Sequence, residues 1–264
     1  MSDEYEIYAI RYGHHDRKAH ENFLGGDPHD DAAMPLDYFV WAIVGQDSTF
    51  VLDTGFAPEM AAKRRRQIVW PVAEGLKAIG IDPAGVKDVI LSHMHYDHAG
   101  NIPLFPAARF HIQDAEMAFV TGRAMCHHAI RAPFEVEHAA QMVHRVFEDR
   151  VRFHDGESEL APGLTLHKVG GHTKGLQVVR VKTRRGWVVL ASDASHLYAN
   201  MKRNWPFPIV VDVDDYLEAF KTIRTLASSE AHVVPGHDPL VLARYPAAKA
   251  GLAGVVRLDA EPKG

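Results

Sequence analysis

Four side chains that can bind a metal ion lie within six positions, directly after a run of residues that favours a β-strand. The segment Val86–Asn101 reads VKDVILSHMHYDHAGN and contains His93, His95, Asp97 and His98. In an extended chain, residues two apart point to the same side, so His93 and His95 can hold one metal ion together. If the chain turns just before Asp97, that residue and His98 can face a second position. The spacing therefore predicts a metal centre at the end of a strand.

Three further residues with metal-binding side chains each follow a strand-like run. They are His172 after Leu164–Val169, Asp193 after Trp187–Ala191, and His237 after Ala231–Val234. Because each of them lies just past the carboxyl end of its run, residues far apart in the sequence can converge on one edge of the sheets. Their placement is therefore compatible with one shared site at that edge.

The remaining segments indicate a mixed sheet with helices outside it. Further runs rich in Val, Ile and aromatic residues predict strands at Tyr5–Tyr12, Tyr38–Val44, Thr49–Asp53, Val86–Leu91 and Gln177–Lys182. Short polar turns at 45–48 and 183–186 predict two hairpins. Helical patterns cover Pro58–Ile79 with a break near Pro71, Asp114–Thr121, Phe134–Phe147 and Val213–Leu226. Gly25–Asp37 and Arg123–Pro133 are expected to be irregular loops. Without a linker-like stretch in mid-chain, we expect residues 1–264 to form a single domain.

Composition narrows the classes of partner. The 264 residues are 47% hydrophobic and 24% charged, as in ordinary globular proteins, and the formal net charge of −5 does not favour nucleic acid or an anionic membrane. The opening MSDEYEIYAI lacks the basic and long apolar segments of a signal peptide, and no uncharged apolar run reaches the roughly 18 residues of a membrane span. We therefore expect a cytoplasmic protein. Cys126 is the only cysteine, which excludes an intrachain disulfide and a site built from several thiolates.

The metal-binding motifs together resemble those of the metallo-β-lactamase superfamily. The run from His93 to Asn101 matches its His-x-His-x-Asp-His motif, and His172, Asp193 and His237 follow in the same order. The resemblance covers Asp53–Asp238, most of the chain, and includes the short acidic motif Asp53-Thr54-Gly55. It implies an α/β fold, an αββα four-layer sandwich with two mixed sheets and outer helices.

The same resemblance implies a dinuclear site. One metal would be held by His93, His95 and His172, the other by Asp97, His98 and His237, and Asp193 would bridge the two. Imidazole and carboxylate ligands suit Zn²⁺, with Mn, Fe or Co as alternatives, so we expect two Zn²⁺ per chain. Two cations roughly 3.5 to 4 Å apart can bind a hydroxide between them and polarise the carbonyl that it attacks. Hydrolysis is the expected reaction.

Within the superfamily, the chain is similar to the N-acyl-homoserine lactone lactonases. The Asp at 193 and the absence of an export signal argue against a true β-lactamase, and only 27 residues follow His237, too few for the helical domain of glyoxalase II. The balance of charge and the lack of extra arms argue against a nuclease. The resemblance implies opening of a lactone ring, a small-molecule substrate and a homodimer. Hydrolysis of another cyclic amide, imide or ester is the alternative, and a mononuclear-iron sulfur dioxygenase is a further one.

Three residues are candidates for catalysis. Asp97 is expected to orient the nucleophile. Many of these lactonases carry a Tyr three residues after the bridging Asp, where its hydroxyl contacts the substrate carbonyl; here that position is His196. An imidazole titrates near neutral pH, so His196 is the candidate donor of a proton to the leaving alkoxide, and Tyr198 is the alternative.

Other residues have two interpretations each. Asp53 either accepts a hydrogen bond from the back of a ligating His or caps a turn. The basic run 63–66 (KRRR) is most simply a solvated helix face, with an anion site as the alternative. The segment 205–207 (WPF) could form an apolar wall, and His127 and His128 could line a pocket or be exposed loop residues.

Overall fold

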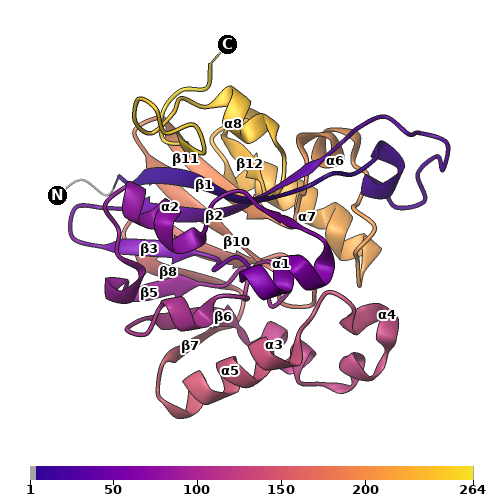
Figure 1. Ribbon diagram of the computed structural model, residues 1–264, viewed down its shortest axis with the longest axis horizontal. Coiled ribbons are helices and arrows are strands. Elements are labelled where there is room, and N and C mark those ends of the chain that lie inside the picture. Colours follow the sequence, from indigo (N-terminus) through magenta and orange to yellow (C-terminus); the bar gives the residue numbers. More distant parts are fainter. Residues whose placement is uncertain (1–3, 264) are drawn as a thin grey trace.

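Two mixed β-sheets pack face to face in the computed structural model, which describes residues 4–263 (Figure 1). The first sheet runs, in spatial order, β13 (Val255–Arg257), β1 (Glu6–His15), β2 (Leu36–Val44), β3 (Thr49–Leu52), β5 (Asp88–Ile90), β6 (Arg109–Gln113) and β7 (Val151–His154), with β4 (Gln67–Ile68) paired to β1. The second runs β12 (Val233–Pro235), β11 (Gly186–Ser192), β10 (Gln177–Thr183), β9 (Leu164–Lys168) and β8 (Glu157–Ala161). Each sheet combines antiparallel and parallel pairs, because β3, β5, β6 and β7 are parallel neighbours, as are β11 and β12.

Alternation along the strands produces three apolar layers. In β1, Ile7 and Ala9 point between the two sheets, while Ile10 points to the opposite face. In β11, Leu190 points between the sheets and Val189 points outward. Because successive side chains of a strand face opposite ways, strands that are apolar on both faces need cover on both sides.

Helices supply that cover, which completes the four layers αββα. They are α1 (Pro58–Arg64), α2 (Val72–Ala78), α3 (Asp114–Val120), α4 (His128–Arg131), α5 (Val136–Phe147), α6 (Tyr198–Arg203), α7 (Val213–Leu226) and α8 (Leu240–Arg244). Residues of α1, α2, α3 and α5 pack on the outer face of the first sheet, and α6 and α7 pack on the second. The predicted fold class is therefore confirmed. No helix within residues 4–263 combines the length and apolar character that a membrane crossing requires.

The predicted elements are present with shifted ends, and several further elements of the structure were not predicted. Both hairpins are present, between β2 and β3 and between β10 and β11. The predicted helical segment 58–79 consists of two short helices, and the second begins just after Pro71, where a break was predicted; the first ends earlier than expected because Arg65 adopts a left-handed conformation (φ 54°), and β4 lies between the two. The segment Arg123–Pro133 is not wholly irregular: it contains a 3-10 turn at Arg123–Cys126 and the short helix α4. Strands β4, β6, β7, β8 and β13 were not predicted.

Candidate metal centre

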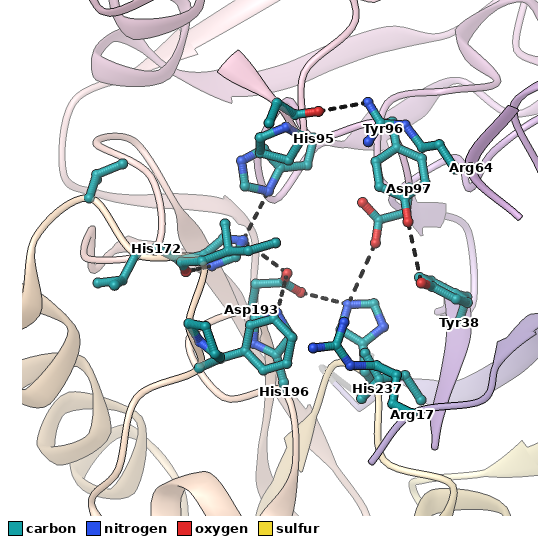
Figure 2. Close-up of a pocket in the computed structure, with 18 of the residues that line it drawn as sticks. Arg17, Tyr38, Arg64, His95, Tyr96, Asp97, His172, Asp193, His196 and His237 are labelled. Carbon is teal, nitrogen blue, oxygen red and sulfur yellow. Dashed lines mark hydrogen bonds and ion pairs between the residues drawn. The ribbon is translucent and has the colours of Figure 1, made fainter. Parts of the chain in front are cut away.

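The carboxylate of Asp193 lies at the centre of the site, and its two oxygens face different groups of imidazoles (Figure 2). Oδ1 lies 3.3 Å from His98 Nε2 and 2.9 Å from His237 Nε2. Oδ2 lies 3.0 Å from His172 Nε2 and 3.8 Å from His93 Nε2. The side chain therefore stands between two sets of ligand-capable atoms, which is the arrangement that a bridging ligand requires.

The two remaining predicted ligands complete these two sets. His95 Nδ1 lies 2.9 Å from His172 Nε2. Asp97 Oδ2 lies 3.6 Å from His98 Nε2 and 3.9 Å from His237 Nε2. The structure thus brings together all seven predicted residues in two groups, each with ligand atoms within 4.8 Å of one another: His93, His95, His172 and Asp193, and Asp97, His98 and His237.

Four strand ends position these residues. His93 follows β5, His172 follows β9, Asp193 follows β11 and His237 follows β12. Gly171, with φ of +83°, lies so close to α7 that an added Cβ would stand 2.5 Å from the Tyr216 Cα, so only glycine lets the chain pass there. The predicted convergence of strand ends is therefore present.

Hydrogen bonds on the outer side of the site fix the tautomer of three imidazoles. Nδ1 of His172 lies 2.7 Å from the Ile209 carbonyl oxygen, and Nδ1 of His237 lies 3.0 Å from the Asp37 carbonyl oxygen. Nδ1 of His98 lies 2.7 Å from the Asp53 carboxylate. Because these acceptors carry no proton, each Nδ1 must be the donor, which leaves the Nε2 lone pair facing the site.

His93 is oriented in the same way through Ser92. The Ser92 hydroxyl donates its one proton to Asp53 Oδ2 at 2.8 Å, so it can only accept from His93 Nδ1, which lies 3.0 Å away. Asp53 also accepts from the Ser92 backbone N–H at 2.7 Å. Of the two interpretations of Asp53, the structure shows the hydrogen bond to the back of a predicted ligand.

The imidazole nitrogens that face the site are better placed to bind a cation than to form hydrogen bonds with one another. Nε2 of His93 and Nε2 of His98 are buried and have no hydrogen-bond partner among residues 4–263. An unpaired buried polar atom is unfavourable, and here two such atoms point at a shared carboxylate. Burial lowers the pKa of His93 and of His95 well below the usual range, which keeps both rings in the neutral state that binds metal. The donor set, imidazole nitrogens with carboxylate oxygens, suits Zn²⁺ and its neighbours.

A buried glutamate ties the two ligand loops together. Glu116 of α3 accepts from the Met94 backbone N–H at 2.9 Å, the Thr173 hydroxyl at 2.6 Å and the Gly175 N–H at 3.0 Å. Burial raises the pKa of this carboxyl. One side chain therefore holds the loops that carry His95 and His172 in fixed positions relative to each other. The sequence analysis did not identify this glutamate.

His196 lies inside the site, but its geometry disfavours the predicted role as a proton donor. The Tyr216 hydroxyl donates to the Asp193 carbonyl oxygen at 2.8 Å, so it accepts from His196 Nδ1 at 3.1 Å. This leaves the His196 Nε2 lone pair 3.1 Å from Asp193 Oδ2. Burial is the main cause that lowers the pKa of His196 to about 3, so a protonated ring is scarce at neutral pH. The ring also stacks on Phe207 at 3.7 Å between centroids. His196 is thus placed as an acceptor or an added ligand.

Tyr198 lies away from the cavity, which contradicts its predicted contact with substrate. Its ring packs under the Arg244 guanidinium at 4.0 Å, and its backbone N–H donates to Asp238 Oδ2 at 2.8 Å. As the first residue of α6, Tyr198 points back toward the core. The hydroxyls that do line the cavity belong to Tyr38 and Tyr96, which lie 3.3 Å apart. Sequence analysis missed both, although Tyr96 lies within the metal-binding motif.

The site opens into a cavity of about 420 Å³. Apolar residues of α4 and of the loops before α5 and α7 form part of its wall, including Ile130, Pro133, Phe207 and Ile209. The predicted apolar wall is therefore confirmed for Phe207, whereas Trp205 packs on Phe23, outside the cavity lining. His128 lines a neighbouring cavity, and His127 is exposed; neither contributes to this lining.

The basic run 63–66 is only in part a solvated helix face, because Lys63 and Arg65 are exposed whereas Arg64 and Arg66 are half-buried. Arg64 forms an ion pair with Glu135 at 2.6 Å and stacks over the Tyr96 ring at 4.0 Å. Both Arg64 and Arg66 line the cavity, while Lys63 and Arg65 point elsewhere. The correction arises because α1 ends within the run, so consecutive arginines face different ways.

The fold and the cluster of seven predicted metal-binding side chains together define a class of protein, and the comparison with known families identifies the same class. The family model for the metallo-beta-lactamase superfamily matches residues 34–237, and the chain belongs to that superfamily.

The names of individual similar proteins are more specific than the name of the superfamily. The chain is 29% identical over 252 residues to the N-acyl homoserine lactonase AttM of Azorhizobium caulinodans, covering 88% of this chain and 93% of that relative. It is 25% identical over 224 residues to an N-acyl homoserine lactonase of a Bacillus species, covering 77% and 82%. Among solved structures, a quorum-quenching N-acyl homoserine lactone lactonase superposes with a TM-score of 0.74 at 21% identity over 90% of this chain and 94% of that one. The dizinc quorum-quenching lactonase AidC superposes with a TM-score of 0.70 at 18% identity, covering 89% and 88%.

Proposed function

We propose that this protein is a metal-dependent hydrolase that opens a lactone ring. The observation that carries the proposal is the Asp193 carboxylate, whose two oxygens face two separate groups of inward-pointing imidazole nitrogens. The relatives named N-acyl homoserine lactonase, which align with most of the chain, support the choice of a lactone over other carbonyl compounds.

Two metal ions fit the donor set. His93, His95 and His172 would hold one, Asp97, His98 and His237 the other, with Asp193 between them and His196 close enough to join. Two bound divalent cations would lower the pKa of a water molecule toward neutrality and polarise the substrate carbonyl. We propose Zn²⁺, because the ligands are imidazoles and carboxylates without thiolate.

The chain's own residues position the substrate and supply the proton. Ring opening leaves an alkoxide that must be protonated, and the residues with a hydroxyl group that line the cavity are Tyr38 and Tyr96. Burial raises the pKa of both, so both stay protonated at neutral pH. Arg66 Nε donates to the Tyr96 oxygen at 3.2 Å, which leaves the Tyr96 hydroxyl proton free to be donated. We therefore assign the proton-donor role to Tyr96 rather than to His196 or Tyr198.

The experiment is metal analysis combined with a pH-indicator assay. Protein prepared with Zn²⁺ should contain about two metal ions per chain and should release acid from N-acyl-homoserine lactones and simple γ-lactones. Cyclic amides, imides and esters serve as competing substrates in the same assay. One iron per chain with oxygen consumption would instead indicate the sulfur dioxygenase reaction, and a preference for a cyclic amide or imide would overturn the lactone assignment.

A further inference from the structure

The formal charges in the cavity wall are all of one sign once the predicted metal ligands are set aside. The ionised side chains that line it are Asp97 and Asp193, which belong to the metal centre, and three arginines, Arg17, Arg64 and Arg66. The chain as a whole carries a formal net charge of −5, so this concentration of arginine opposes the average. In Figure 2, Arg17 and Arg64 lie on the same side of the site as Tyr38, while His172 lies on the opposite side.

Two of these arginines lack a carboxylate partner. Arg64 is paired with Glu135, whose Oε1 lies 3.2 Å from Arg64 Nε and 2.6 Å from Nη2, while Glu135 Oε2 pairs with Lys63 at 2.7 Å. Neither Arg17 nor Arg66 forms an ion pair with any residue in the part of the chain that the structure describes. Both side chains are half-buried. A desolvated charge without a partner is unfavourable, which is the state expected of a group whose partner arrives with the substrate.

Arg66 is held rigidly by neutral groups. Its Nε donates to the Tyr96 hydroxyl at 3.2 Å, and its Nη1 donates to the Arg64 carbonyl oxygen at 2.7 Å and approaches His15 Nε2 at 3.0 Å. Burial, followed by the charge of Arg66, lowers the pKa of His15 to about 4, so His15 accepts as a neutral ring. These contacts fix the guanidinium in place without cancelling its charge.

Arg17 is held in the same manner on the segment between β1 and β2. Its Nε donates to Asn22 Oδ1 at 2.8 Å, and its Nη2 donates to the Glu21 carbonyl oxygen. The guanidinium lies over the Phe207 ring at 5.0 Å, and Phe207 stacks on His196 beside the metal centre. Burial is the main cause that lowers the pKa of Arg17; the nearby Glu21 opposes this shift, and the charge of Arg66 adds to it.

We propose that Arg17 and Arg66 form an anion subsite that binds a carboxylate carried by the substrate, so that the preferred substrates are lactones with an acidic substituent. This inference rests on the proposed lactone hydrolysis and specifies its substrate class. Two fixed guanidinium groups next to a metal centre match a small compound with a lactone carbonyl at one end and a carboxylate at the other. An uncharged acyl chain would leave both arginines unpaired.

The test compares two ligands that differ only in charge, on the Zn²⁺-loaded protein. The substrates are γ-butyrolactone γ-carboxylate and its neutral primary amide. Wild-type kcat/KM should favour the carboxylate by about tenfold or more. Arg17→Gln and Arg66→Gln should each reduce that ratio by about tenfold, toward equal hydrolysis of the two lactones and chiefly through the KM of the carboxylate, as expected for the loss of a hydrogen bond between charged groups. Arg66→Lys should restore part of the ratio.

Arg65→Gln is the matched control, because it removes the same charge one position away from the cavity lining. It should leave the ratio within about twofold of wild type. If the wild type hydrolyses both lactones equally and the arginine variants do not change the ratio, the anion subsite is refuted while lactone hydrolysis stands.

Calorimetric titration with the open hydroxydicarboxylate separates the two proposals. Binding that Arg17→Gln and Arg66→Gln weaken, together with no hydrolysis of any lactone, would support the subsite and refute the hydrolase. Binding that these variants leave unchanged would refute the subsite, whatever the activity.

Discussion

Replacing Asp53 by Asn tests whether the tautomer of His98 controls metal binding. Asp53 is fully buried and accepts three hydrogen bonds: from His98 Nδ1 at 2.7 Å, from the Ser92 hydroxyl at 2.8 Å and from the Ser92 N–H at 2.7 Å. Its φ of 63° lies in the left-handed region, where Asn is among the best tolerated residues, so the backbone should not change. The substitution therefore keeps the shape of the side chain and changes its hydrogen-bonding chemistry and its charge.

The expected loss of metal affinity follows from the hydrogen-bond acceptor that the substitution removes. The Asn oxygen can keep the bond from the Ser92 N–H, but its NH₂ group would face His98 Nδ1. His98 would then have to carry its proton on Nε2, the atom that lies 3.3 Å from Asp193 Oδ1 and faces the predicted metal. Loss of such an outer partner typically weakens metal affinity by about 10- to 100-fold, or roughly 1.4 to 2.7 kcal/mol.

Competition with a chromophoric chelator measures the affinity of each metal in turn. The site with Asp97, His98 and His237 should weaken, and the site with His93, His95 and His172 should change less. Asp88→Asn is the matched control, since Asp88 also bonds to a histidine, His111 at 3.0 Å, outside the cavity lining. If the Asp53→Asn variant binds both metal ions as tightly as the wild type does, the hypothesis that the His98 tautomer controls metal binding is refuted.

Three further outcomes are expected. Asp193→Ala should lower metal content and reduce lactone hydrolysis by several orders of magnitude, because both groups of imidazoles lose their shared carboxylate; near wild-type turnover with two metals bound would contradict this. Tyr96→Phe should lower kcat by roughly 10²- to 10⁴-fold if its hydroxyl donates the proton, whereas Tyr198→Phe should leave kcat within about twofold; the reverse result would return the role to Tyr198. Burial, then His111, lowers the pKa of His154 to about 4 from 6.5. The unfolded chain therefore takes up a proton between these values and the folded chain does not, so stability is lost as pH falls from 6.5 toward 4. The Tm of His154→Gln should fall less than that of wild type between pH 7 and 5, and equal falls would exclude His154 as a cause.

Apolar strands with two buried faces could be located from the sequence, and strands with polar residues could not. The pattern located β2, β10 and β11, where Val and Ile recur on both faces. It missed β6, because His111 and Gln113 interrupt the apolar run although both are buried. Gln113 is accommodated by Gln177 of the second sheet at 2.8 Å, a contact that no local pattern reveals.

The strands β7, β8 and β13 were missed for a related reason. Each lies at the edge of its sheet, where one face or one side needs no apolar partner. The segment Glu157–Ala161, for example, has no fully buried residue. These three edge strands are therefore defined by the neighbour they pair with rather than by their own composition.

The metal-binding residues of the first motif could be predicted from the sequence because they lie close together in one short segment. Period-two spacing in an extended segment decides that His93 and His95 face the same way, and the turn that follows places Asp97 and His98 together. The resemblance of these motifs to a known superfamily then supplied the partners His172, Asp193 and His237. No packing information was needed for either step.

The groups that surround the metal centre depend on the tertiary structure. Whether Tyr198 or Tyr96 reaches the cavity depends on how α6 packs against the core, and the sequence spacing to Asp193 does not contain that information. Arg66 faces the cavity because α1 ends at Arg65 and β4 pairs with β1 beside it. By itself, the sequence therefore identified the residues predicted to bind metal: spacing within a strand and turn sets the direction of His93, His95, Asp97 and His98, and the family resemblance adds the other three. Only the tertiary structure decided the substrate-facing residues, since these come from separate segments whose side chains meet through packing.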